Sequence, residues 1–152
     1  YNMSDWKKYE VQLVRVGNDG ARTRVQSPEE LASLFTEYAD QVTKEALFVV
    51  AFDGQNGVIG INKVYEGTAT GTSVRITEIL QPVMVMNAAG LAVVHNHPSG
   101  DPVASDADIQ LTKELIEAAK IMDFMLLDHV VIGANGRHSS IRRDNQDLDW
   151  QS

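Results

Sequence analysis

The stretch that decides the fold is LAVVHNHPSGDPVASDAD, residues 91–108. It opens with a short apolar run, residues 91–95, which has the length and composition of a buried strand. Residues 98–102, PSGDP, then interrupt the strand with side chains that favour a turn. Apolar residues at helical spacing follow from Ser105 to Met122. The sequence therefore predicts a strand, a turn and a helix in succession.

Strand-like segments flank this stretch on both sides. Residues 46–52, ALFVVAF, form a continuous apolar run that is typical of a central strand buried on both faces. Residues 58–65 and 126–132 are also predicted as strands. A turn at residues 134–136, ANG, leads into a short strand at residues 138–141.

Two further helices are predicted from their start signals. Ser27 can cap the first, and Glu30 can complete its capping box. The second is predicted over residues 77–89 with Thr77 as its cap, and Pro82 is expected to delay or kink it because proline lacks a backbone donor. Helices thus alternate with strands, which predicts a three-layer α/β/α domain around a central mixed sheet.

The two ends of the chain carry weaker signals. Residues 10–16, EVQLVRV, are rich in strand-forming side chains and are predicted as a strand. The last ten residues are charged and are expected to fray. At 152 residues, we expect one domain, residues 1–152, with a core of its own.

Composition excludes several classes of protein. The hydrophobic fraction of 43% is that of a globular protein, and no apolar run approaches the roughly 20 residues that span a bilayer. A net charge of −8 disfavours binding to nucleic acid by this chain alone. The absence of cysteine fits a cytoplasmic protein and leaves His, Asp and Glu as the available metal ligands. We expect no membrane association.

The chemistry of the chain is concentrated around two histidines. His95 and His97 project to the same side of the strand end, because successive strand side chains alternate between faces. Two imidazoles so placed can share one metal ion, and Asp108, in the first turn of the next helix, could add a carboxylate. Two His and one carboxylate would leave a fourth tetrahedral position for water, the pattern of a catalytic zinc site.

Simpler interpretations of the same residues remain open. Two histidines at a strand end can form hydrogen bonds in a loop without any metal. Ser105 followed three residues later by Asp108 is also a variant of the capping box. Asn96, between the histidines, faces the other way and is expected to be structural. His129 is expected to be a buried structural histidine or a hydrogen-bonding partner of a ligand rather than a ligand itself.

The complete spacing is more specific than its parts. His95-x-His97-x7-Ser105-x2-Asp108 resembles the zinc-site signature of the JAMM (MPN+) metalloprotease superfamily. The segments HNHPSGDP (residues 95–102), DIQLT (108–112) and DHVVIG (128–133) are similar to the RadC-like branch. The resemblance runs over about residues 27–141, most of the chain, and implies a JAMM/MPN-like fold of the cytidine-deaminase-like type.

The resemblance also implies roles for individual residues. His95, His97 and Asp108 would bind one zinc ion per chain, with water as the fourth ligand. Glu45 matches the acidic residue that acts as general base and then acid, and Ser105 matches the residue that helps to hold the oxyanion. These roles imply a zinc metallopeptidase or isopeptidase that acts on a peptide or isopeptide-linked protein.

The chain departs from the RadC pattern in three places. We expect no room in these 152 residues for the helix-hairpin-helix region that usually precedes the RadC-like domain. Ala104 replaces the common proline, and residues 76–78 (ITE) lack the common Arg-Glu pair. One alternative is a DNA-repair or mobile-element accessory module of the RadC family. Another is a scaffold domain in which the metal is purely structural.

Overall fold

The computed structural model describes residues 5, 7, 20–36, 44–67 and 74–151. The strand predicted at residues 10–16 lies outside these ranges. Along the chain the elements are α1 (Pro28–Ser33), β1 (Glu45–Phe52), β2 (Val58–Gly67), α3 (Ile76–Val85), β3 (Gly90–Asn96), α4 (Asp106–Ile121), β4 (Met125–Ile132), β5 (His138–Ser140) and α5 (Ile141–Asp144).

The strands form one mixed sheet in the order β2-β1-β3-β4-β5. β3 and β4 are parallel neighbours, because α4 returns the chain from the end of β3 to the start of β4. The other neighbouring strands are antiparallel. β3 is the central strand, and all seven of its residues are buried. The continuous apolar run of β1 is likewise buried from Ala46 onwards. The predicted mixed sheet with buried central strands is confirmed.

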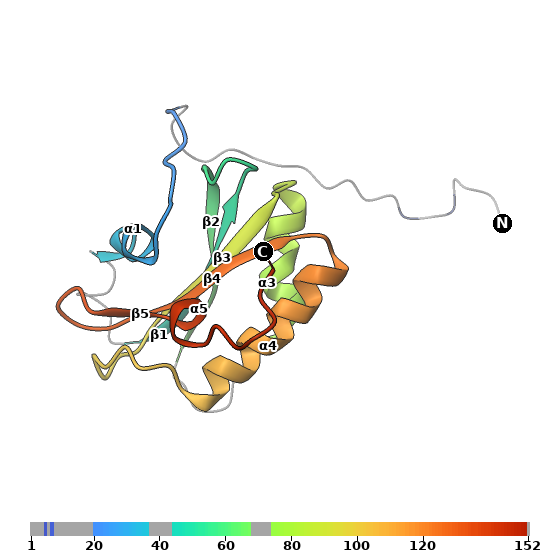
Figure 1. Ribbon diagram of the computed structural model, residues 1–152. Helices are drawn as coiled ribbons and strands as arrows, with labels where there is room; N and C mark the ends of the chain where they lie inside the picture. Colours follow the sequence, from blue (N-terminus) through green and yellow to red (C-terminus); the bar gives the residue numbers. More distant parts are fainter. Residues whose placement is uncertain (1–4, 6, 8–19, 37–43, 68–73, 152) are drawn as a thin grey trace.

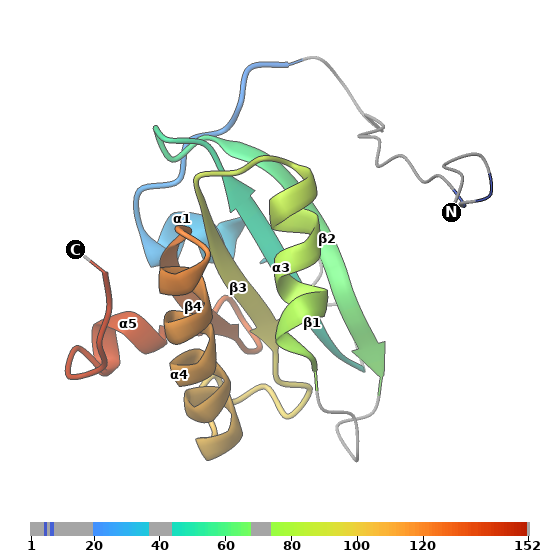
Figure 2. The ribbon, with the colours of Figure 1, turned by 90° about the vertical axis from the view of Figure 1, so that its right-hand side faces the viewer.

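Helices cover both faces of the sheet. Figure 2 shows α3 and α4 side by side over one face, with α1 on the other, and Figure 1 shows the same layers nearly edge-on. Each face has its own apolar cluster: Ile79 and Leu115 belong to the cluster under α3 and α4, and Leu31 and Phe35 to the cluster on the α1 side. This is the predicted three-layer arrangement.

The start of α3 differs from the prediction. The helix begins at Ile76, and its N-cap is Arg75, which makes no side-chain cap bond, so Thr77 lies within the first turn. Pro82 is accommodated inside the helix, which ends at Val85. Burial of one helix face against the sheet outweighs the loss of one backbone hydrogen bond, a balance that local sequence signals do not report.

The C-terminal prediction was wrong. The Trp150 indole donates a hydrogen bond of 2.9 Å to the Asn145 carbonyl, and the Arg142 guanidinium lies 5.5 Å from the Trp150 ring centroid. Arg142 also donates to the Gln151 carbonyl at 2.9 Å. These contacts hold residues 142–151 against the body of the protein, although their composition is that of a solvated tail.

In the described part of the chain, no helix has the length and apolar character needed to cross a membrane.

At α1, the predicted Ser27 cap is present, since the Ser27 hydroxyl accepts the Glu30 N–H at 3.1 Å. Tyr38 and Val42 continue the helical spacing of apolar side chains that begins at Leu31, which predicts a longer helix, but both lie outside the described residues.

Candidate metal centre

The two histidines lie at the end of the central strand. His95 is the sixth residue of β3, and His97 is the first residue after the strand. The His97 N–H still donates to the Ile132 carbonyl at 3.0 Å, so the parallel pairing with β4 extends beyond the strand bounds. This pairing keeps His97 extended and places both imidazoles on the same side, as strand alternation predicts.

The turn after His97 is held against the β4–β5 connection. The Gly100 N–H donates to the His97 carbonyl at 2.9 Å, and Gly100 has φ +87°, which favours glycine. The Gly100 carbonyl accepts the Ala134 N–H at 3.0 Å. A side chain on Gly133 would overlap that carbonyl oxygen. The turn therefore depends on two glycines in close contact.

The helix start that follows the turn orients the carboxylate. Ser105 is the N-cap of α4: its hydroxyl accepts the Asp108 N–H at 3.1 Å, and the Asp108 carboxylate accepts the Ser105 N–H at 2.8 Å. The capping-box interpretation is therefore correct. The cap uses a lone pair of the hydroxyl and leaves its proton available for another acceptor.

Three ligand-type groups converge between the strand and the helix. The Nε2 atoms of His95 and His97 are 3.0 Å apart. One Asp108 oxygen lies 3.1 Å from His95 Nε2, and the other lies 3.1 Å from His97 Nε2. His95 is buried, whereas the side chains of His97 and Asp108 remain 18% and 12% exposed, so solvent can reach one side of the group.

This donor set fits a metal ion. The ligand atoms of a tetrahedral zinc with bonds of about 2.0–2.1 Å lie about 3.3 Å from one another, within a few tenths of an ångström of the separations found here. The Nδ1 atom of His97 faces the Asp101 carbonyl at 2.9 Å, and a carbonyl only accepts. In a neutral His97 the proton is therefore on Nδ1, and Nε2 presents a lone pair to the carboxylate.

In the metal-free protein, these close contacts shift the pKa values of His97 and Asp108. The hydrogen bond to Asp108 raises the pKa of His97, although burial works in the opposite direction. Burial alone would raise the pKa of Asp108, but the nearby imidazoles of His95 and His97 and the Ser105 N–H outweigh it and lower that pKa. The site therefore favours a carboxylate beside a positive charge, which either a proton or a metal ion can supply.

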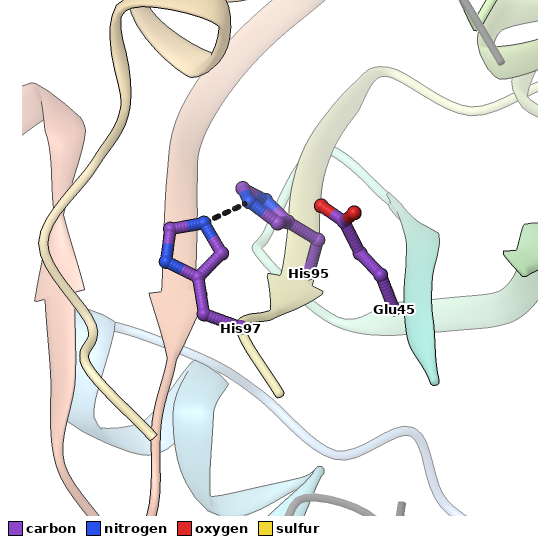
Figure 3. A group of neighbouring side chains, drawn as sticks. All are labelled: Glu45, His95 and His97. Carbon is purple, nitrogen blue, oxygen red and sulfur yellow. Dashed lines mark hydrogen bonds between the residues drawn. The ribbon is translucent and has the colours of Figure 1, made fainter. Parts of the chain in front are cut away.

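Glu45 faces the histidines from the neighbouring strand. It is the first residue of β1, and Figure 3 shows its carboxylate pointing towards the imidazole of His95. One ligand atom each from Glu45, His95 and His97 lie within 4.8 Å of one another, so these three are a second possible ligand group that shares the histidine pair. Glu45 also accepts a hydrogen bond of 3.2 Å from the Tyr65 phenol.

Asn96 holds the backbone on both sides of Glu45. Its side-chain oxygen accepts the Ala46 N–H at 2.7 Å, and its amide donates to the Lys44 carbonyl at 3.0 Å. Asn96 therefore has the structural role predicted for it, facing away from the two histidines. Nothing local in the sequence connects Asn96 with Glu45, because the contact spans 50 residues and arises only when β1 pairs with β3.

Two more side chains stand behind His95. His95 Nδ1 lies 2.8 Å from His129 Nε2, and His129 Nδ1 lies 2.7 Å from the Thr112 hydroxyl. His129 is completely buried on β4 and has the position predicted for a partner of a ligand. Thr112 was missed, although it lies four residues after Asp108, one turn further along α4, where it reaches the same side of the helix.

Comparisons with known proteins identify the family. A family model described as the RadC-like JAB domain matches residues 25–146. A UPF0758 protein of Roseiflexus castenholzii is 40% identical over 121 residues, which are 80% of this chain and 52% of that protein. A UPF0758 protein of Desulforudis audaxviator is 40% identical over 111 residues, 73% of this chain and 48% of that protein.

The chain spans about half the length of the curated relatives it matches. The family match itself covers the sheet, the three converging side chains and Glu45. The chain therefore belongs to the family of RadC-like JAB domains.

Proposed function

We propose that this chain is a zinc-dependent hydrolase that cleaves peptide or isopeptide bonds. His95, His97 and Asp108 are its ligands for one zinc ion, and Glu45 is its proton-transfer group. The observation that carries the proposal is the convergence of two Nε2 atoms and a carboxylate within 3.1 Å of one another, with a second carboxylate facing them. JAB domains are a metal-dependent family, which supports the same conclusion.

Asp108 is a better third ligand than Glu45 on geometry. One Asp108 oxygen lies 3.1 Å from His95 Nε2 and the other lies 3.1 Å from His97 Nε2. Both distances are close to the spacing between the ligand atoms of a tetrahedral ion. Glu45 belongs to a looser group, with separations up to 4.8 Å. A carboxylate at that distance can contact a water molecule in the fourth position instead of the ion, which suits a general base.

Zinc is the ion that this donor set favours. Two imidazoles and one carboxylate form a small site of mixed nitrogen and oxygen ligands, which zinc binds with one position left for water. Magnesium and calcium favour sites made of oxygen atoms. When bound, zinc would polarise a substrate carbonyl and lower the pKa of its water towards neutrality.

The protein's own residues would complete the reaction. Glu45 accepts a proton as a water oxygen bonds to the amide carbon, and it returns that proton to the amine nitrogen as the carbon–nitrogen bond breaks. The Ser105 hydroxyl, whose proton the helix cap does not use, donates to the developing oxyanion. Tyr65 and Asn96 keep Glu45 in place during both transfers.

The overall charge favours a protein substrate over a nucleic acid. The chain carries 21 acidic and 13 basic residues, so its field opposes the approach of a polyanion. A peptide or isopeptide bond presents a neutral carbonyl and has no such electrostatic cost.

The test compares two Glu→Gln variants in hydrolysis assays. Zinc-loaded protein is incubated with a pool of peptides and isopeptide-linked conjugates, and the release of amines is followed. We expect cleavage that a chelator abolishes and that Glu45→Gln reduces by about 100-fold or more without loss of metal. Glu78→Gln, on the exposed side of α3, is the matched control and should keep full activity.

A structural role for the metal would give a different pattern. The wild-type protein would then hold zinc and lose its melting transition when the metal is removed, yet it would release no amine from any member of the pool. That result would contradict the proposed hydrolase.

A further inference from the structure

A buried chain of hydrogen bonds connects two of the proposed ligands behind the metal centre. It runs from His95 Nδ1 to His129 Nε2 (2.8 Å), from His129 Nδ1 to the Thr112 hydroxyl (2.7 Å) and from that hydroxyl to the Asp108 carbonyl (2.7 Å). His95, His129 and Thr112 are each at most 2% exposed. Water therefore has no access to these three contacts.

With a neutral His129, only one arrangement of protons satisfies all three contacts. The Asp108 carbonyl carries no proton, so the Thr112 hydroxyl must donate to it. The hydroxyl oxygen then has to accept from His129, which places the His129 proton on Nδ1. Any other arrangement with a neutral His129 leaves two electronegative atoms 2.7 or 2.8 Å apart with no proton between them.

His129 passes this constraint on to His95. His129 is completely buried, and neither of its two hydrogen-bonding partners is an acid, so its ring is neutral and carries a single proton. With that proton on Nδ1, His129 Nε2 can only accept, and His95 must donate from its own Nδ1. His95 Nε2 is then left with a lone pair directed at the carboxylate of Asp108, 3.1 Å away.

We infer that His129 and Thr112 are positioning residues that fix His95 in the Nδ1–H tautomer, the form whose Nε2 atom can bind a metal ion. The inference rests on the proposed function for its consequence, although the tautomer itself is a property of the metal-free protein. Thr112 has a second effect through its bond to the Asp108 carbonyl, which ties the orientation of one ligand to the backbone of another.

Loss of this chain would favour the competing tautomer. Without the hydroxyl of Thr112, His129 has no acceptor for a proton on Nδ1, and it gains by donating from Nε2 to His95. His95 would then carry its proton on Nε2 and donate it to Asp108, in the space that a metal ion needs. Changes to hydrogen-bonding partners of metal-bound histidines typically cost about 10- to 100-fold in metal affinity.

The experiment combines imidazole nitrogen NMR with zinc affinity. Metal-free protein labelled with ¹⁵N in its histidines is studied at about pH 8, where ordinary imidazoles are neutral, and the two-bond couplings report which nitrogen carries the proton. Zinc affinity is measured by competition with a chromophoric chelator. Both measurements are made on wild type, Thr112→Val, Thr112→Ser and Thr77→Val, the last being the same change on an exposed helical residue.

We expect Nδ1–H signals for His95 and His129 in the wild type, in Thr112→Ser and in Thr77→Val. Thr112→Val should shift His95 towards Nε2–H and weaken zinc binding by about 10- to 100-fold. A wild-type His95 with its proton on Nε2, or a Thr112→Val variant with unchanged tautomer and affinity, would overturn the inference. If the wild type shows the expected tautomers but binds no zinc, the inference about His129 and Thr112 is supported and the proposed function is contradicted.

Discussion

The Tyr65 phenol donates a hydrogen bond of 3.2 Å to the carboxylate of Glu45 across the paired strands β1 and β2. Tyr65 lies opposite Leu47, two residues from Glu45 and on the same face of the sheet. Burial and the nearby Glu45 carboxylate raise the pKa of Tyr65 to about 12, so the phenol keeps its proton at neutral pH. The proposed general base is therefore oriented by a permanent donor.

Removal of this donor should reduce turnover without removing metal. Tyr65→Phe deletes one hydrogen bond, worth about 1 kcal/mol, so we expect kcat to fall about fivefold because Glu45 is held less firmly. Steady-state kinetics and zinc content check the prediction together. If the variant lost its zinc, Tyr65 would instead be needed to hold the metal ligands in place.

Substitutions of Ser105 should separate its two roles. Ser105→Gly removes the hydroxyl but costs the helix cap only a few tenths of a kcal/mol, whereas Ser105→Ala costs about 1 kcal/mol. If the hydroxyl also stabilises the oxyanion, both variants should lose about 100-fold in kcat. Thermal unfolding measures the first role and kinetics the second. Full activity in the glycine variant would leave Ser105 with the cap alone.

Gly133→Ala should disturb the metal centre from outside it. The added methyl group would overlap the Gly100 carbonyl and push the turn that orients His97. Overpacking of this kind costs about 1–3 kcal/mol, and we expect weaker zinc binding with it. Gly54→Ala is the matched control, because a Cβ there meets nothing within 4 Å. Equal zinc affinities and unfolding midpoints in the two variants would contradict the role given to this contact.

The stability of the metal-free protein should depend on pH through the shifted pKa values of His97 and Asp108. In the metal-free protein the pKa of His97 is raised, so its contribution is complete below its ordinary value of 6.5 and is lost as pH rises through the raised value. The lowered pKa of Asp108 adds stability above 3.8 that is lost as pH falls. The metal-free protein therefore loses the contribution of His97 to its stability at alkaline pH.

A bound zinc ion takes the place of the proton on His97. We expect zinc affinity to increase with pH, by up to about tenfold per unit below the raised pKa of His97, and to level off above it. Chelator competition between about pH 6 and about pH 8 measures this dependence. An affinity that stays constant across the range would mean that His97 does not give up a proton on binding.

Local sequence signals were enough for the outline of the site. The two-residue period of a strand places His95 and His97 together, and the capping signal brings Asp108 into the first turn of α4. Glu45 was selected only by family resemblance, because its neighbours Tyr65 and Asn96 reach it through strand pairing over 20 and 50 residues. Long-range contacts of this kind leave no periodic trace in the sequence.

The fold shows the same division between local and tertiary effects. Apolar runs predicted β1, β3 and β4 correctly, since central strands must be buried on both faces. The prediction that Thr77 caps α3 was wrong, because packing, rather than a side-chain cap, fixes the start of that helix. The C-terminal residues are ordered by contacts between Arg142 and Trp150, which their polar composition did not indicate.

The ligand set is tested most directly by elemental analysis of zinc per chain in the wild type, His97→Ala, Asp108→Asn and Glu45→Gln, with His138→Ala as a histidine control away from the site. We expect one zinc in the wild type, in Glu45→Gln and in His138→Ala, and none in His97→Ala or Asp108→Asn. Retention of zinc by Asp108→Asn together with its loss from Glu45→Gln would contradict the account and assign the third ligand to Glu45.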